Sequence, residues 1–387
     1  MNSLANLIRS IQDVEWEFSK ADTQYLTHNI HRYSGKFIPQ IANTVIQLLS
    51  DPKEVVFDPY LGSGTTALEA ILSDRGCIGV DLNPLAILIA GVKTAVIDVQ
   101  TLQTFQQDLL TSVDFALDPQ MSLLAPRYRG ISRSFEEDPR YNNPWNQKWY
   151  QDHVLRQLIR IYNVIEAVDD LRLRQVAQVS FSDILRRSSN ASSHYPNVMY
   201  DKNTKKKPLP LRPFRESFRA NIAQLIALSR RFGQLSCPSC RIALENNTSL
   251  SLPSCSVDAI VTHPPYIAAV PYAEYGCLSL EWLGFSSKQL DAELTGGKRQ
   301  RKDVVDRFLH DYHLMFAESY RVLKPGRFAF YMVGNPTANG TVVDLHEKTV
   351  ECAVSQGFRH LYTASRRGSN RRGNKMGEEY LIFFQKE

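Results

Sequence analysis

The sequence predicts an α/β protein with a mostly parallel sheet flanked by helices, plus a largely helical insertion. Apolar strand-like runs alternate with helix-like segments over residues 54–100, the alternation stops over 101–235, and it resumes before the end of the chain. This alternation is typical of a parallel sheet covered by helices. The 387 residues suffice for one large domain with an insertion, or for two domains. We therefore expect three segments, 1–100, 101–235 and 236–387.

The first segment contains a strand, a tight loop, a helix and a second strand. The strand is expected at 54–58, in the apolar run EVVFD, and the turn PYLGSG follows it. TTALEAILSDRG begins with threonine and ends with Gly76, as a helix with a glycine stop does. CIGVD, at 77–81, predicts a second buried strand.

The two later segments differ in pattern. The middle contains helical runs such as HVLRQLIRIYNVIEAV and an irregular basic stretch, and its strand signals are sparse. After it, strands are expected at 256–262, 327–334 and 379–386, with helices at 305–326 and 342–357 between them. The order of the strands in the sheet does not follow from these patterns.

Composition is ordinary for a globular protein, with 43% hydrophobic and 22% charged residues. A net charge of +5 permits a polyanionic partner without requiring one. No apolar run is long enough for a membrane span, and the N-terminus lacks the pattern of a secretion signal. Cys237 and Cys240 lack the second pair that a zinc site needs, so no metal is expected. A cytoplasmic protein without a membrane partner is the expectation.

A glycine loop and a later acid point to a nucleoside ligand. Gly62 and Gly64 lie between a strand and a helix, where glycine allows a sharp turn and close approach to main-chain N–H groups. The loop has no lysine, so the usual phosphate-cradling pattern is absent. Asp81 ends the next strand, about twenty residues on, where nucleoside-binding folds place an acid for the ribose hydroxyls. Asp81 could instead, or in addition, cap the helix that follows.

Four stretches taken together resemble a known family. They are HRYSGKFIP at 31–39, then DPYLGSGTT, GVDLNPLA and VDAIVTHPPY. In this order they resemble the amino-group DNA methyltransferases that use S-adenosylmethionine. The resemblance covers roughly 24–100 and 241–387. It implies a Rossmann-like methyltransferase fold and S-adenosylmethionine as the cofactor.

The resemblance implies seven cofactor-binding residues. Lys36 and Phe37 fall where the family encloses the methionine part of the cofactor, and Asp81 falls at the ribose position. Asn246 stands where the family usually has an aspartate near the adenine ring, and an amide can also meet the adenine edge. The full set is Lys36, Phe37, Asp58, Gly62, Gly64, Asp81 and Asn246.

The HPPY loop, residues 263–266, is the expected catalytic element. An exocyclic amino nitrogen is a poor nucleophile because its lone pair is delocalised into the ring. Acceptors at the His263 side chain and the Pro264 carbonyl could draw its two N–H bonds towards tetrahedral geometry. Pro264 and Pro265 fix φ and have no N–H to compete. Tyr266 would stack on a base flipped out of the duplex, worth ~1–3 kcal/mol.

His263 departs from the family pattern, which has Asp, Asn or Ser before Pro-Pro-Tyr. The flanking VTHPPY and the downstream YAEYGCLSLEWLG resemble the cytosine-N4 branch, so cytosine N4 is the expected target. A neutral imidazole has an acceptor nitrogen and a protonated one has none. Turnover is therefore expected to fall as the pH drops through the imidazole pKa, between about pH 8 and 5.5. A relative that has lost activity is the alternative.

Basic residues gather in three polar segments, 202–219, 298–302 and 366–375. Arginine and lysine on loops suit phosphate contacts. Double-stranded DNA is the expected partner, with a cognate restriction endonuclease as a further candidate, and the insertion is the candidate for reading sequence. The residues expected to contact DNA are Lys205, Lys206, Lys207, Lys298, Arg299, Arg366, Arg367, Arg371 and Arg372.

Other functions remain open at this stage. The same chemistry could act on adenine N6 or on RNA, or the chain could bind nucleic acid without catalysis. A hydride-transfer enzyme of dinucleotide-binding type is a distant alternative, because the HPPY loop has no role in it.

Overall fold

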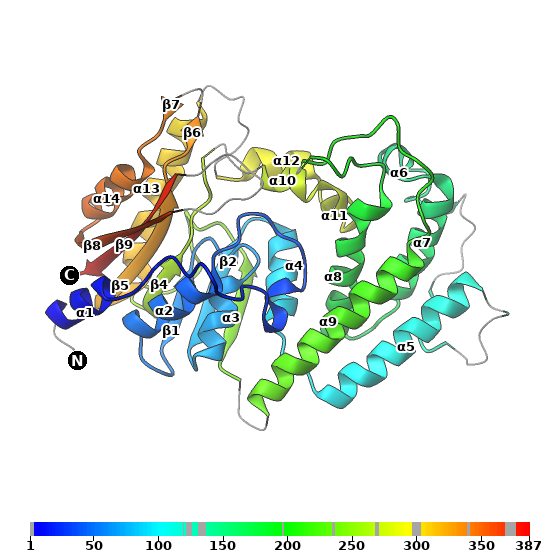
Figure 1. The fold of residues 1–387 in the computed structure, drawn as a ribbon, viewed down its shortest axis with the longest axis horizontal. Helices are drawn as coiled ribbons and strands as arrows, with labels where there is room; N and C mark the ends of the chain where they lie inside the picture. Colours follow the sequence, from blue (N-terminus) through cyan, green and yellow to red (C-terminus); the bar gives the residue numbers. More distant parts are fainter. Residues whose placement is uncertain are drawn as a thin grey trace.

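The computed structural model describes residues 4–118, 120, 126–130, 137–195, 197–233, 237–267, 271–295, 303–338, 341–367 and 377–387. In this part of the chain a seven-stranded sheet lies beside a layer of helices (Figure 1). No helix within these ranges is long and apolar enough to cross a membrane.

The sheet is mostly parallel, as the alternation predicted. Its order is β3-β2-β1-β4-β5-β9-β8, and β9 runs antiparallel to both β5 and β8. The strands are β1 (Val55–Asp58), β2 (Gly76–Asp81), β3 (Cys240–Leu244), β4 (Val257–Thr262), β5 (Leu323–Gly334), β8 (Phe358–Arg367) and β9 (Glu378–Lys386). β6 (Thr337–Ala338) and β7 (Thr341–Val342) form a separate two-stranded ribbon. The two edge strands, β3 and β8, were not predicted from the sequence.

Helices cover both faces of the sheet, which explains its nearly continuous apolar strands. Val56 points to the face covered by α1 (Leu4–Gln12), α2 (Pro39–Leu49) and α3 (Thr65–Leu72). Its neighbour Phe57 points to the opposite face, covered by α13 (Val304–Val322) and α14 (Leu345–Ser355). The same alternation places Phe330 and Tyr331 of β5 in different cores. Helix α1 and the C-terminal end of the chain both lie near β8 and β9 (Figure 1).

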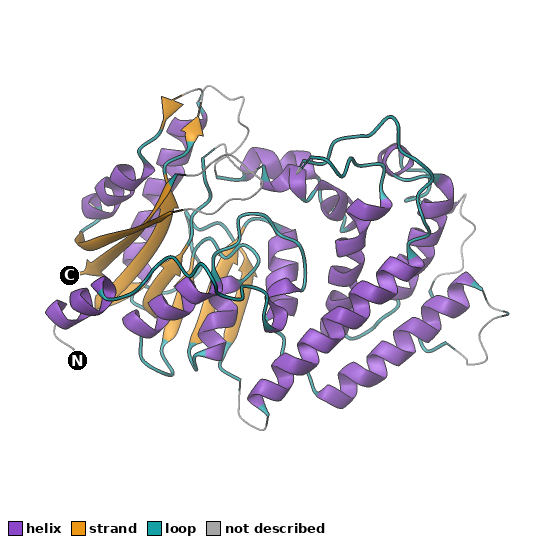
Figure 2. Cartoon of the chain, viewed as in Figure 1, coloured by secondary structure: helices purple, strands orange, loops and turns teal. Residues whose placement is uncertain are grey.

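The middle of the chain forms helices, shown beside the sheet in Figure 2. They are α5 (Val99–Leu117), α6 (Pro144–Trp149), α7 (Asp152–Glu166), α8 (Leu171–Ser188) and α9 (Leu211–Phe232). Their core also includes side chains of α4 (Pro84–Lys93), which follows β2, so the helical layer packs against the β2 side of the sheet.

A segment after β4 joins this helical layer. It forms α10 (Tyr272–Tyr275), α11 (Cys277–Trp282) and α12 (Ser287–Glu293). Trp282 of α11 packs edge-on against Tyr150, Tyr162 and Phe181, with ring centroids 5.1–6.0 Å apart. The helical layer thus extends beyond 101–235, and the three-segment division of the chain stays a prediction.

The strand order places a ligand site. The chain leaves β1 towards β2 on one side, and β4 pairs with β1 on the other side. The loops that follow β1 and β4 therefore part at this point and leave a crevice at the carboxyl ends of the strands. The glycine loop, Asp81 and the HPPY loop all follow these carboxyl ends.

Candidate active site

A single cavity brings the predicted loops together. Its volume is about 810 Å³, including the open mouth. The glycine loop after β1, the end of β2 and the HPPY loop after β4 all line it. The predicted site residues on its wall are Lys36, Phe37, Asp58, Gly62, Asp81, His263 and Pro265.

The glycine loop needs its glycines for two different reasons. Gly62 has φ +51° and Gly64 has φ +80°, which are left-handed conformations that favour glycine. A Cβ at Gly64 would also lie 2.7 Å from the Ala90 Cβ in α4. Gly64 therefore lets α3 and α4 approach closely, while Gly62 lines the cavity with its main chain.

Asp81 holds the glycine loop in place. Its Oδ2 accepts a hydrogen bond from the Gly62 N–H at 2.8 Å, and its Oδ1 accepts one from the Asn83 N–H at 2.8 Å. A carboxylate offers about four lone-pair positions, so acceptor capacity remains for a ribose hydroxyl. Burial raises the pKa of Asp81. The cap of α4 is Asn83, which accepts from the Leu85 N–H at 3.0 Å, so Asp81 is not the helix cap.

Asp58 links the glycine loop to the end of β4, directly before the HPPY loop. The Thr262 hydroxyl donates to Asp58 Oδ1 at 2.6 Å, and the Tyr60 N–H donates to the same oxygen at 3.0 Å. Burial raises the pKa of Asp58 to about 6, although these hydrogen bonds oppose the rise. Asp58 is thus a buried carboxylate on the cavity wall that titrates near neutral pH.

Lys36 and Phe37 lie beside the catalytic loop. Phe37 is buried, and its ring centroid lies 5.5 Å from that of His263 and 6.2 Å from that of Phe330. Lys36 Nζ donates to the main-chain carbonyls of His28 and His31, at 3.0 and 2.8 Å. Burial lowers the pKa of Lys36 to about 8. Both residues form part of the cavity wall.

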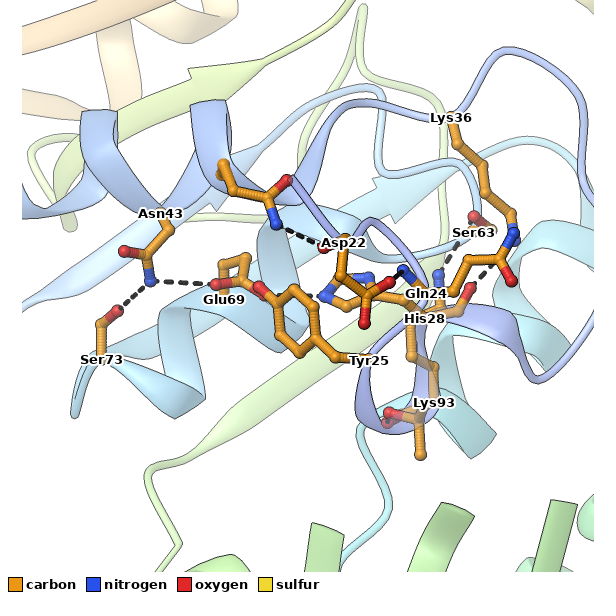
Figure 3. A network of polar contacts seen from close by, with 12 residues as sticks. Asp22, Gln24, Tyr25, His28, Lys36, Asn43, Ser63, Glu69, Ser73 and Lys93 are labelled. Carbon is orange, nitrogen blue, oxygen red and sulfur yellow. Dashed lines mark hydrogen bonds and ion pairs between the residues drawn. The ribbon is translucent and has the colours of Figure 1, made fainter. Parts of the chain in front are cut away.

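A polar network, shown in Figure 3, anchors the segment before Lys36. Glu69 of α3 accepts hydrogen bonds from Tyr25 Oη at 2.6 Å and Asn43 Nδ2 at 2.9 Å, and pairs with His28 Nε2 at 2.7 Å. Fully buried Lys93 donates to the Ser63 hydroxyl at 3.2 Å, within the glycine loop. Sequence reasoning missed this network because its members are scattered from residue 25 to residue 93.

The HPPY loop differs from expectation in the place of its tyrosine. His263 and Pro265 line the cavity, whereas Pro264 is buried. Tyr266 is 5% exposed and lies outside the cavity wall, so it offers no open face for a base in this conformation. Its hydroxyl lies 2.8 Å from His263 Nε2. Burial, assisted by Arg366, lowers the pKa of His263 to about 4, which corrects the expected pH range of its titration.

Two other tyrosines, both half-buried, line the cavity. Tyr33 and Tyr272 are stacked with ring centroids 6.1 Å apart and an interplanar angle of 27°. Both line the first cavity and also a second one of about 2200 Å³, open solvent included. Tyr33 belongs to the HRYSGKF stretch and Tyr272 follows the HPPY loop, so each lay next to a predicted motif.

Asn246, the residue predicted to lie near the adenine ring, does not line the cavity. Asn246 is exposed, and its side chain accepts a hydrogen bond from the Thr248 N–H at 3.0 Å. Its neighbours Glu245 and Asn247 line the cavity instead, and Asn247 Nδ2 donates to the Pro59 carbonyl at 2.9 Å.

The predicted DNA-contacting residues divide into four groups. Lys205 and Lys206 are exposed, and Lys207 lines the second cavity. Arg367 is exposed at the end of β8. Arg366 has its guanidinium buried against Glu379 at 2.8 Å and is not available to phosphate in this arrangement. Lys298, Arg299, Arg371 and Arg372 lie outside the described residues.

The second cavity has a basic wall. It lies between the 31–34 segment, α8 and the α10–α11 segment. Among the described residues that line it, Asp183 is the one acid, against the basic side chains of Arg32, Arg186, Arg187 and Lys207. Within the described ranges, no group of three or more His, Cys, Asp or Glu side chains could hold a metal ion.

Comparisons with known proteins show what this chain is similar to. The DNA methylase family matches residues 9–91. The chain is 24% identical to Type II methyltransferase M.MvaI of Kocuria varians, over 92% of this chain and 87% of that protein. It is 21% identical to Type II methyltransferase M.BsoBI of Geobacillus stearothermophilus, over 78% and 62%. A SAM-dependent methyltransferase structure from Methanosarcina mazei is 12% identical, covers 88% of this chain and 96% of that one, and has a TM-score of 0.37.

The cavity suits the cofactor that these motifs imply. It offers an acid with spare acceptor capacity, glycine main chain at its wall and aromatic rings beside the HPPY loop. The chain is therefore a relative of the amino-group DNA methyltransferases, with the Rossmann-like methyltransferase fold and S-adenosylmethionine as its cofactor.

Proposed function

We propose that this protein is a site-specific DNA methyltransferase that modifies the exocyclic amino group of a flipped base, with cytosine N4 as the target. The observation that supports it most is the shared cavity, which Asp81, the glycine loop, His263 and Pro265 all line. A nucleoside held on one side and a base held on the other would meet in this cavity.

Each chain group has a defined task in this proposal. When bound, S-adenosylmethionine supplies a methyl group already activated by its sulfonium. Asp81 accepts from the ribose hydroxyls, and Lys36 and Phe37 enclose the methionine end. The His263 imidazole and the Pro264 carbonyl accept hydrogen bonds from the two N–H groups of the exocyclic amine. This localises the lone pair on the amino nitrogen. Because the methyl group is activated in advance, the protein contributes mainly positioning.

Tyr33 and Tyr272 replace Tyr266 as the proposed faces for the base. They line both cavities, so a base that moves from the second cavity into the first would pass beside them. Aromatic faces stabilise an unstacked base by ~1–3 kcal/mol. Tyr266, which is buried, takes a different part that is argued below.

The second cavity is the proposed seat of the duplex. Its basic side chains, Arg32, Arg186, Arg187 and Lys207, suit a polyanion, and it adjoins the first cavity through the two shared tyrosines. The helical layer at 99–232 supplies one wall, which agrees with a role for the insertion in recognition.

Cytosine N4 is favoured over adenine N6 by the stretch around the catalytic loop. VTHPPY and YAEYGCLSLEWLG resemble the cytosine-N4 branch. The second of these stretches forms α10 and α11, whose Trp282 joins the helical core, so its sequence also serves packing. The choice of base therefore rests on the catalytic loop more than on these helices.

The test is methyl transfer from labelled S-adenosylmethionine to duplex DNA and to total RNA, followed by mass analysis of the released nucleosides. N4-methylcytosine from DNA is the expected product. N6-methyladenine would show that the target is adenine and not cytosine. Transfer to RNA alone would show that the substrate is RNA, and absence of any transfer would reject catalysis. Cleavage of unmethylated but not methylated DNA by a protein of the same host would identify the proposed cognate endonuclease.

A further inference from the structure

Tyr266 lies in a chain of hydrogen bonds rather than on the wall of the cavity. Its hydroxyl lies 2.8 Å from His263 Nε2 and donates to Glu379 Oε1 at 3.0 Å. The ring is buried and packs edge-on to the imidazole, with centroids 5.1 Å apart. The phenol thus connects the catalytic histidine to an acid of the last strand.

A buried arginine ends this chain. Arg366 and Glu379 lie directly opposite one another in the register of β8 and β9. Arg366 Nη1 donates to Glu379 Oε2 at 2.8 Å, and the two side chains are only 4% and 10% exposed. A carboxylate paired with a buried guanidinium can only accept hydrogen bonds. The hydrogen between Tyr266 and Glu379 must therefore belong to the phenol.

Counting hydrogens then decides the state of the imidazole. The phenol has one hydrogen, which it donates to Glu379, so its oxygen accepts from His263. Nε2 must carry that hydrogen. A neutral imidazole with hydrogen on Nε2 has its acceptor lone pair on Nδ1. Within the described residues, the contact with Tyr266 is the one hydrogen bond of the ring, and the ring lines the cavity.

We propose that Tyr266 and Glu379 are positioning residues that hold His263 in the tautomer with hydrogen on Nε2, so that Nδ1 accepts an amino N–H of the target base. This inference rests on the proposed function. It also explains why a histidine needs help here. The side-chain oxygen of Asp, Asn or Ser can always accept, whereas an imidazole nitrogen accepts in only one of its two neutral tautomers.

The groups that face His263 agree with a neutral ring. Phe37 covers it from the N-terminal segment, Tyr266 from its own loop, and Arg366 is the charged group near it. Burial and the positive charge of Arg366 both disfavour an imidazolium, and the pKa of His263 is lowered to about 4. Tautomer, and not charge, is therefore the property that the chain must control at neutral pH.

The sharpest test is Glu379→Gln. The amide would keep its oxygen towards Arg366 and turn its NH₂ towards Tyr266, which reverses the chain: the phenol then donates to Nε2, and the hydrogen of the imidazole moves to Nδ1. Nitrogen NMR of ¹⁵N-histidine-labelled protein, with His263→Asn to assign the signal, reports the tautomer without any substrate. We expect hydrogen on Nε2 in the wild type and on Nδ1 in Glu379→Gln. Hydrogen on Nδ1 in the wild type, or an unchanged tautomer in the variant, would overturn the inference.

Activity measurements complete the test. The single-turnover rate of Glu379→Gln should fall at least about 100-fold, because a positioned imidazole in the wrong tautomer is inactive. Tyr266→Phe, which breaks the chain without reversing it, should fall less, by about 10-fold. Glu378→Gln loses the same charge at the neighbouring, exposed position and should keep the wild-type rate. Cofactor affinity and thermal unfolding identify a variant that is merely misfolded.

The two proposals fail in different ways. If wild-type protein methylates no nucleic acid, the proposed function fails while NMR still reports the tautomer. If it methylates DNA and Glu379→Gln is as fast as the wild type, the function stands and the positioning role is rejected.

Discussion

His263 titrates well below neutral pH because it is buried and faces Arg366, with a pKa of about 4. A base with a lowered pKa stays neutral above that value and becomes protonated only as the pH falls through it. The single-turnover rate at saturating cofactor should therefore be flat from about pH 8 to 5.5 and decline only towards about pH 4.

A pH series of single-turnover methyl transfer checks this expectation. His263→Asn supplies the control, since an amide acceptor does not titrate and its profile should stay flat at lower pH. A wild-type rate that halves near pH 6.5 would show that the imidazole is not shielded as this geometry requires.

Asp58 titrates within the physiological range because burial raises its pKa to about 6. It is an anion on the cavity wall at pH 7 and becomes neutral as the pH falls through about 6. The cofactor carries positive charge, so its affinity should weaken as the pH falls, by at most about tenfold per pH unit below the pKa.

Calorimetric titration of S-adenosylmethionine between about pH 5 and 8 measures this dependence. Asp58→Asn keeps the shape of the side chain but cannot titrate. Its affinity for S-adenosylmethionine should therefore be lower than that of the wild type at pH 7 and nearly independent of pH. An equally steep dependence in this variant would assign the effect to another group.

At the scale of elements, the glycine loop allows α3 and α4 to pack closely and also lines the cavity. Gly64→Ala places a Cβ 2.7 Å from the Ala90 Cβ and 3.0 Å from its Cα, in a left-handed conformation. We expect a loss of about 3 kcal/mol or more in the free energy of unfolding, together with weaker cofactor binding.

Gly284→Ala is the matched control in urea unfolding. Gly284 has φ +84° and open space where a Cβ would stand, so only the backbone strain of about 1–2 kcal/mol applies. If both variants lost the same free energy of unfolding, the contact between Gly64 and α4 would not contribute to the cost of the substitution.

Elements with one clear hydrophobic period were predictable from the sequence, whereas the two strands at the edges of the sheet were not. The apolar runs of β1, β4 and β5 and the amphipathic α13 appear at nearly the expected residues. β3 and β8 lie at the two edges of the sheet, where one neighbour strand is missing and side chains stay partly exposed. Their mixed sequences, CRIAL and FRHLYTASRR, therefore lack a clear strand signal.

At the scale of the whole molecule, the basic loop at 202–210 is held against the helical layer. Gln151 Nε2 donates to the Lys205 carbonyl at 3.0 Å, and the Lys207 N–H donates to Gln151 Oε1 at 3.0 Å. This attachment holds the loop backbone, and Lys207 lines the second cavity.

Replacing Lys205, Lys206 and Lys207 together with alanine should weaken DNA binding at all sequences. The dependence of log K on log salt should become shallower by up to about 3, because each phosphate contact contributes about 0.9 to the slope. Fluorescence anisotropy over a salt series measures it. Lys53→Ala removes an exposed lysine paired with Asp74 and should leave the slope unchanged.

The order of motifs along the chain determined much of this protein. Strand ends, glycines and the acid Asp81 depend on local backbone geometry, so their spacing predicted a nucleoside site. The family resemblance came from the four motif stretches themselves. Strand order was decided by tertiary structure, because it depends on which strands pair over long separations.

Side-chain environments likewise followed from pairing rather than from spacing. Arg366 looked like a loop arginine for DNA, yet the register of β8 and β9 buries it against Glu379. Tyr266 looked like a stacking face, yet the same acid draws its hydroxyl away from the cavity. Glu379 lies 13 positions from Arg366 and 113 positions from Tyr266. No local pattern shows that both side chains meet the same acid.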